Sequence, residues 1–171
     1  MPKTENKVRA EKGLFHIAFE VNGEKKEFAA KTNETLLDLL RRYGLRGAKK
    51  GCDSGDCGSC TVLVDGKTAL GCLMLAVQAH GRKVTTIEGL GSPTEPHPIQ
   101  TAFVQAGAVQ CGFCIPGMIL ATKALLDANP EPKEAEIRHA LDGNLCRCTG
   151  YVKQVEAVQL AAKALKKQPK K

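Results

Sequence analysis

The stretch GCDSGDCGSC, residues 51–60, spaces three cysteines as Cys-x4-Cys-x2-Cys and separates them with glycines. The cysteines are Cys52, Cys57 and Cys60, and Cys72 follows after eleven further residues. All eight cysteines of the 171-residue chain fall in such short glycine-containing stretches. Disulfides are rare in reducing compartments, so cysteines grouped in this way indicate metal or redox chemistry.

The triplet spacing is typical of plant-type [2Fe–2S] ferredoxins, where one loop encloses the cluster and a more distant cysteine completes the ligands. A structural zinc site is the alternative, but zinc sites usually combine two close cysteine pairs. Three glycines favour the cluster, because they let backbone N–H groups approach sulfur and permit positive φ: Gly51, Gly55 and Gly58. Asp53 and Asp56 are interpreted as solvated loop residues that cap local N–H groups.

A second set of four cysteines lies in two pairs, each before an expected helix. The pairs are Cys111 with Cys114, spaced Cys-x2-Cys, and Cys146 with Cys148, spaced Cys-x-Cys. The helices are expected to begin near Pro116 and near Gly150. Free N–H groups at helix N-termini favour thiolates, so two such ends facing one another would form a tetrathiolate pocket. A zinc knuckle remains open for this set.

Other polar residues near the cysteines have less specific signals. Arg147 is either a solvent-facing turn residue or a cation placed against a cluster or a partner's phosphate. Gln110 directly precedes Cys111 and is a candidate contact to whatever that site serves. None of the histidines pairs with a cysteine at ligand spacing, so all are interpreted as structural or solvated: His16, His80, His97 and His139.

The first half of the chain is predicted to form a compact α+β unit. Strands are expected over 14–21 and 25–30, joined by a turn at Asn22-Gly23. A short leucine-rich helix follows, capped by Thr32 or Asn33 and ended by Gly44. A second hairpin turns at Asp65-Gly66, and KVTTIEGL, residues 83–90, supplies a fifth strand.

The second half reads as a bundle of four helices, over 98–107, 116–129, 133–142 and 150–166. Three prolines between the halves indicate a linker. The predicted division is a flexible extension (1–13), a ferredoxin-like domain (14–90), a linker (91–98), a helical domain (99–165) and a basic tail (166–171).

Composition limits the class of protein. A hydrophobic content of 43% is ample for a core, no apolar run is long enough to span a bilayer, and the N-terminal sequence lacks a secretory signal, so a cytoplasmic location is expected. The net charge of +7 comes largely from the C-terminal lysines and from Lys49-Lys50. With five Phe, two Tyr and no Trp to stack on bases, nucleic-acid binding is not expected.

Three motifs in this order, GAKKGCDSGDCGSCTVLVDGK, QCGFCIPGMILATKALL and GNLCRCTGY, resemble the small iron–sulfur subunit of the xanthine oxidase family of molybdenum hydroxylases. The resemblance covers about residues 14–165. It implies a β-grasp ferredoxin-like domain followed by a four-helix domain, each with one [2Fe–2S] cluster.

The resemblance also implies a role for each cysteine. Cys111, Cys114, Cys146 and Cys148 would hold the proximal cluster, beside a molybdopterin cofactor in a large subunit that Gln110 and Cys148 contact. Cys52, Cys57, Cys60 and Cys72 would hold the distal cluster, facing FAD in a medium subunit. The implied assembly is a dimer of heterotrimers without nucleic acid or membrane.

The expected function is therefore electron transfer within a molybdenum-dependent oxidoreductase, because the chain contains no segment suited to substrate chemistry. A stand-alone two-cluster ferredoxin is the main alternative. A zinc-organised adaptor or nucleic-acid-binding protein is a third.

Overall fold

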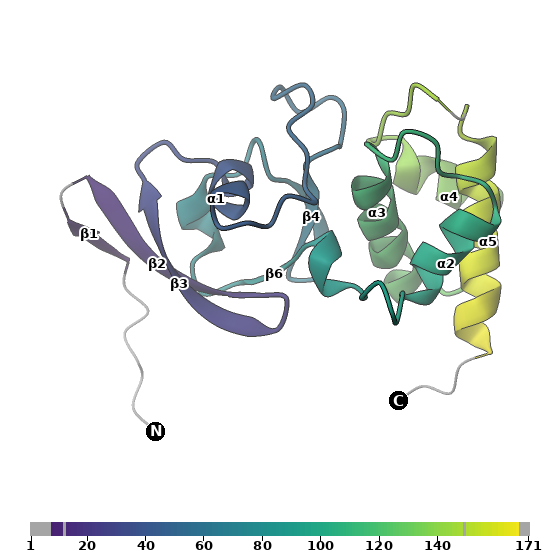
Figure 1. Cartoon of the computed structure of the whole chain (residues 1–171), viewed down its shortest axis with the longest axis horizontal. Helices are drawn as coiled ribbons and strands as arrows, with labels where there is room; N and C mark the ends of the chain where they lie inside the picture. Colours follow the sequence, from purple (N-terminus) through teal and green to yellow (C-terminus); the bar gives the residue numbers. More distant parts are fainter. Residues whose placement is uncertain (1–7, 12, 149, 168–171) are drawn as a thin grey trace.

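The computed structural model describes residues 8–11, 13–148 and 150–167, which form a sheet-containing part and a helical part packed side by side (Figure 1). The sheet-containing part comprises β1 (Arg9–Glu11), β2 (Leu14–Val21), β3 (Glu24–Lys31), α1 (Leu36–Arg42), β4 (Thr61–Val64), β5 (Lys67–Leu70), β6 (Lys83–Thr85) and the short 3-10 helices η1 (Ala76–Ala79) and η2 (Ile87–Gly89). The helical part comprises α2 (Pro98–Gln105), α3 (Ile115–Ala128), α4 (Glu134–Leu141) and α5 (Val152–Lys166). The predicted α+β fold is confirmed.

The strands form one mixed sheet in which β2 is central. β3 pairs with β2 along its whole length in the antiparallel direction, while β1 pairs with the start of β2 and β6 runs parallel to its end. The sheet continues from β6 through β4 to β5, both antiparallel pairs. Both predicted hairpins are confirmed, and Asn22 and Asp65 at their turns have φ of 52° and 50°.

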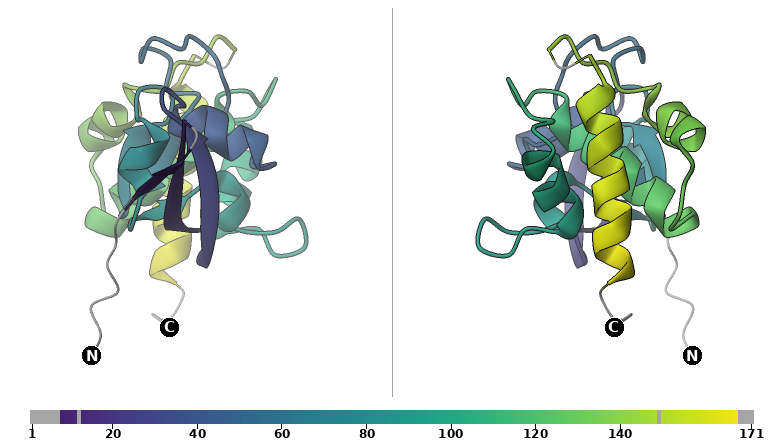
Figure 2. Two further views of the ribbon diagram at one scale, coloured as in Figure 1. Left: turned by 90° about the vertical axis from the view of Figure 1, so that its left-hand side faces the viewer. Right: turned by 90° about the vertical axis from the view of Figure 1, so that its right-hand side faces the viewer.

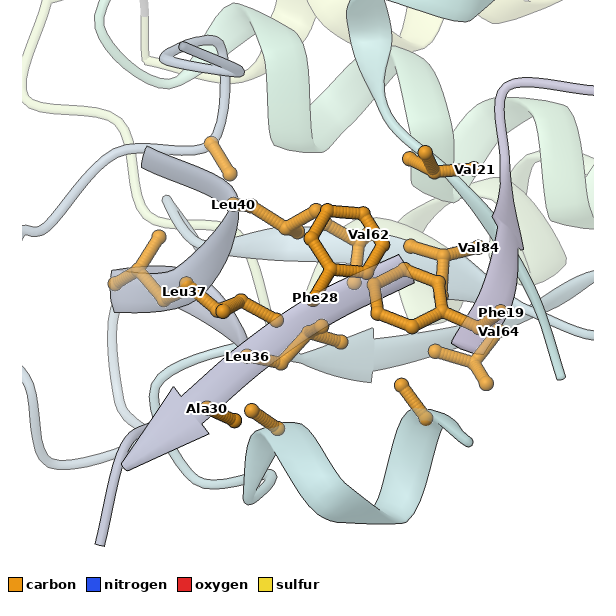
Figure 3. Packing of buried hydrophobic residues seen from close by; sticks show 14 of the residues in the cluster. Phe19, Val21, Phe28, Ala30, Leu36, Leu37, Leu40, Val62, Val64 and Val84 are labelled. Atoms are coloured by element: carbon orange, nitrogen blue, oxygen red, sulfur yellow. The ribbon is translucent and has the colours of Figure 1, made fainter. Parts of the chain in front are cut away.

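Helix α1 shares one hydrophobic core with the sheet. Phe19 and Phe28 stack from neighbouring strands with ring centroids 4.3 Å apart, and the leucines of α1 pack against them (Figure 3). These leucines are fully buried: Leu36, Leu37, Leu39 and Leu40. Burying a leucine side chain is worth about 2 kcal/mol, so this helix anchors the core of the sheet-containing part.

Several local predictions differ from the structure. The N-cap of α1 is Thr35, not Thr32 or Asn33, and its Oγ1 accepts from the Asp38 N–H at 3.1 Å. The predicted fifth strand ends at Thr85, because the Thr86 N–H bonds to the Asn22 side chain at 2.8 Å and the chain then enters η2. Residues 1–13 were predicted to form a flexible extension, but Arg9–Glu11 form strand β1, which pairs with β2. Residues 1–7 and 12 are outside the described residues.

In the helical part, α5 packs against α2 and α4, which flank it in the right-hand view of Figure 2. α3 contacts α2 and α4 on one side and β4 and β5 on the other, so it joins the two parts. The four predicted helices of the bundle are thus present, with ends within two residues of those predicted. None of the helices in the described ranges has the length and apolar character needed to cross a membrane.

Candidate metal centres

Two of the predicted ligands meet at the open end of the β4–β5 hairpin. Thr61 pairs with Leu70, and the Gly71 N–H donates to the Cys60 carbonyl oxygen at 3.2 Å, so Cys72 lies one residue beyond the position opposite Cys60. Their Sγ atoms lie 3.3 Å apart, and both side chains are buried. The hairpin register therefore fixes one pair of thiols at the edge of the sheet.

The other two candidate ligands of this set lie on the loop between α1 and β4. The Cys52 Sγ accepts hydrogen bonds from the N–H groups of Ser54 and Cys57, both at 3.4 Å. Hydrogen bonds from the Ser54 side chain and these N–H groups lower the pKa of Cys52 to about 6, whereas burial raises the pKa of Cys60 to about 11. We refer to Cys52, Cys57, Cys60 and Cys72 as the loop site.

The three glycines of this loop serve different purposes. A Cβ at Gly51 would lie 2.7 Å from the Cys57 Sγ, so glycine leaves room for a sulfur there. Gly55 has a φ of +91°, as expected for a glycine that permits positive φ, and the position of its missing Cβ faces the Leu73 side chain. Gly58 faces the backbone of Gly143 in the helical part.

The second set of cysteines is gathered beside the starts of α3 and α5. Cys114 is the N-cap of α3, as expected, but α5 begins at Val152, so Cys146 and Cys148 precede it by about one turn. The thiols of Cys114 and Cys146 are hydrogen-bonded to one another, as are those of Cys111 and Cys148. We refer to these four cysteines as the helix site.

Burial and neighbouring thiols raise the pKa of two helix-site cysteines, Cys114 and Cys148. Burial, followed by the hydrogen bond with Cys146, raises the pKa of Cys114 to about 12. The hydrogen bond with Cys111 raises the pKa of Cys148. Because metals bind thiolates, loading of this site must release protons.

The remaining predicted residues lie at the edges of the two sites. Asp53 forms an ion pair with Lys50 at 2.9 Å, and the Ser54 hydroxyl donates to Asp56, so both aspartates make local loop contacts. Gln110 and Arg147 are exposed beside the helix site. Arg147 lines a cavity of about 490 Å³ between the sites, which is also lined by Cys57 and all four helix-site cysteines.

The arrangement of thiols fits a two-iron cluster better than a single zinc ion. Tetrahedral zinc with Zn–S bonds of about 2.3 Å would bring four sulfurs within about 3.8 Å of each other. A zinc ion in either set would therefore need all four thiols of that set around one point. The thiols instead approach in pairs, as expected when each of two irons takes two thiolates.

Comparison with known proteins also identifies two [2Fe–2S] binding domains in the chain. Residues 19–81 match the 2Fe-2S iron-sulfur cluster binding domain family, and residues 86–159 match the [2Fe-2S] binding domain family. The nicotinate dehydrogenase small FeS subunit of Eubacterium barkeri is 49% identical, over 85% of this chain and 93% of its own length. The nicotine 6-hydroxylase small subunit of Paenarthrobacter nicotinovorans is 48% identical, over 83% of this chain and 86% of its own length.

A solved structure extends the likeness to the fold. A chain in the crystal structure of quinoline 2-oxidoreductase from Pseudomonas putida 86 aligns with a TM-score of 0.86 and 41% identity, over 90% of this chain and 97% of that chain. The protein belongs to the small iron–sulfur subunits of the xanthine oxidase family of molybdenum hydroxylases. This small subunit is therefore an electron-transfer component of an oxidoreductase, and the alternative of a stand-alone ferredoxin is disfavoured.

One residue of the small subunit's helix site was not predicted from the sequence. Gln154, in the first turn of α5, is fully buried, and its Nε2 lies 3.7 Å from the Cys146 Sγ and 3.5 Å from the Ala108 carbonyl oxygen. A signal was present, because Gln154 occupies the same helix face as buried Val158 and Ala161. A polar side chain on such an apolar face requires a partner.

Proposed function

We propose that the loop site and the helix site each hold one [2Fe–2S] cluster through four thiolates. The sulfur contacts support a pairing of ligands on individual irons: Cys60 with Cys72, Cys114 with Cys146, and Cys111 with Cys148. Cys52 and Cys57 complete the loop site. When bound, each cluster accepts and returns one electron at a time.

Backbone N–H groups donate to one ligand sulfur in each of the two sites. In the loop site the Ser54 and Cys57 N–H groups donate to the Cys52 Sγ. In the helix site the Cys148 N–H donates to the Cys146 Sγ at 3.4 Å, and the Cys146 N–H donates to the Tyr151 hydroxyl at 2.9 Å, which holds the ligand loop. Hydrogen bonds to ligand sulfur and burial set cluster potentials, so the two differently built sites should have unequal potentials.

The contact between the two ligand loops supports the proposal that electrons pass between the loop site and the helix site. The Leu145 N–H donates to the Cys57 carbonyl oxygen at 2.9 Å. Cys57 is a loop-site ligand, and Leu145 is bonded directly to Cys146 of the helix site. One hydrogen bond thus links the backbones of the two sites, which supports electron transfer within this chain.

The exposed edges of the two sites support separate partners. Cys148 and Cys111 are exposed together with Gln110, Phe113 and Val152, and we assign this surface to a large subunit that carries molybdopterin. The helix site would then be proximal, with Gln110 and Cys148 contacting the pterin.

At the loop site, the exposed Cys52 lies on the same loop as Gly55, which faces the exposed Leu73. We assign this distal surface to a medium subunit that carries FAD. The assembly proposed is a dimer of heterotrimers in the cytoplasm, where a reducing environment keeps thiols available as ligands. The domain limits proposed are 14–90 and 99–165, joined by 91–98.

The substrate is determined by other subunits. Relatives of comparable identity are named for nicotinate and for quinoline, so similarity in this subunit does not select a substrate.

Metal analysis and purification test the proposal. The complex purified from its native host should contain about four iron and four acid-labile sulfide per copy of this chain, with two distinct electron paramagnetic resonance signals on reduction. Large and medium subunits should co-purify in equal amounts. Stoichiometric zinc would refute the clusters, whereas four iron in an isolated chain would favour the diffusing ferredoxin.

A further inference from the structure

Gln154 bridges the two loops that supply the helix-site thiols. Its backbone belongs to α5, while its amide reaches Ala108 on the loop before Cys111 and Cys146 on the loop before α5. The side chain is fully buried, and Ala108 is fully buried as well. The amide is therefore held inside the helical part, against a cluster ligand.

The chemistry of the two neighbours fixes which end of the amide faces the sulfur. A carbonyl oxygen and a ligand thiolate are both hydrogen-bond acceptors, and only the NH₂ group of glutamine can donate to both. The reverse orientation would place the amide oxygen against a carbonyl and a negative sulfur. The N–H groups consequently point toward Cys146 and Ala108.

A buried N–H donor at a ligand sulfur favours the reduced form of a cluster. Reduction adds negative charge that is shared with the thiolates, and a fixed dipole of the right sign stabilises it. The effect is stronger in a buried site than in water, because the surrounding dielectric is low.

We propose that Gln154 is a positioning residue that raises the reduction potential of the helix-site cluster through its hydrogen bond to the Cys146 sulfur. This inference rests on the proposed function, because it requires Cys146 to be a cluster ligand. It goes beyond that function by assigning to Gln154 the role of favouring reduction of the helix-site cluster.

The test is a redox titration of the purified complex, with both reduced clusters followed by electron paramagnetic resonance. Gln154→Leu and Gln154→Met remove the donor and replace it with an apolar side chain of similar size. We expect the equilibrium constant for reduction of the helix-site cluster to fall about tenfold, which is about 59 mV for a one-electron couple. The loop-site cluster in the same molecules should keep its potential.

Thr122→Val is the matched control. Thr122 is fully buried in α3, and its hydroxyl donates to the Met118 carbonyl oxygen at 2.8 Å, so the substitution also removes a buried polar group from the helical part. It should leave both potentials unchanged.

Two results would overturn the proposal. One is an unchanged helix-site potential in both Gln154 variants with full iron content. The other is loss of helix-site iron from both variants while Thr122→Val stays loaded, which would assign Gln154 a structural role. Failure of the proposed function is distinguishable, because the wild-type complex itself would then lack a second cluster signal.

Discussion

Gly58 and Gly143 meet backbone to backbone where the two parts of the molecule join. A Cβ at Gly58 would lie 2.0 Å from the Gly143 carbonyl oxygen, and one at Gly117 would lie 2.6 Å from the Gly58 oxygen. Gly58 also has a φ of +67°. The hydrogen bond from Leu145 to Cys57 is formed directly beside this contact. Small residues at this junction thus permit the link between the two ligand loops.

Gly58→Ala should push the two parts of the molecule apart. We expect the free energy of unfolding to fall by about 3 kcal/mol, from overpacking added to the cost of positive φ. Electron transfer between the clusters should also slow, because the loops that carry them separate. Gly66→Ala is the control, since Gly66 has a φ of +80° but nothing within 4 Å of its Cβ position. Equal stability loss in the two variants would contradict the role of close approach.

Cys148→Ser should remove the helix-site cluster and spare the loop site. Cys148 is paired with Cys111 on one proposed iron, so its loss leaves that iron with a single thiolate. Iron content should fall from about four to about two per chain, with loss of one of two paramagnetic signals. Two unchanged signals would show that Cys148 is not a ligand.

Gly51→Ala should affect the loop site alone. The added methyl group would lie 2.7 Å from the Cys57 Sγ, so this sulfur must move away from its position. We expect loop-site iron to fall at least twofold, measured by iron analysis and by the intensity of the corresponding signal. Gly143→Ala adds the same atom where no neighbour lies within 4 Å and should retain full iron. Full loading of Gly51→Ala would show that the loop tolerates the displacement.

The helical part should become less stable in mild acid, because His97 then tends to be protonated. Its Nδ1 accepts from the Ile99 N–H at 3.2 Å at the start of α2, and burial, followed by the charge of Lys123, lowers its pKa. Below the ordinary histidine pKa of about 6.5, the unfolded chain binds a proton that the folded chain resists, so stability falls as the pH decreases. The N-cap hydrogen bond that protonation of His97 would remove contributes about 1 kcal/mol to stability.

His97→Asn keeps a capping oxygen and removes the titration. Thermal unfolding of the loaded wild-type protein should shift to lower temperature between pH 7.5 and 5.5, and this variant should shift less. Parallel shifts in the two proteins would mean that other groups cause the acid sensitivity.

Local sequence signals predicted most of the secondary structure. Asn22-Gly23 and Asp65-Gly66 specify tight turns by their own backbone preferences, and the leucines of α1 specify its buried face. The cap of α1 was misplaced because Thr32, Asn33 and Thr35 are all acceptable capping residues. Strand β1 was missed because three residues carry too little periodicity, and its pairing with β2 defines it.

The sequence by itself predicted the candidate donor atoms of both sites, because cysteine spacing and glycine content are local properties of the chain. Tertiary structure decided which thiols meet, since Cys114 and Cys146 are brought together by the packing of α3 and α5 and not by spacing. The same packing placed Gly58 against Gly143 and the Gln154 amide against the Cys146 sulfur. Contacts between residues far apart in sequence depend on how helices and strands pack, and a local pattern does not specify that geometry.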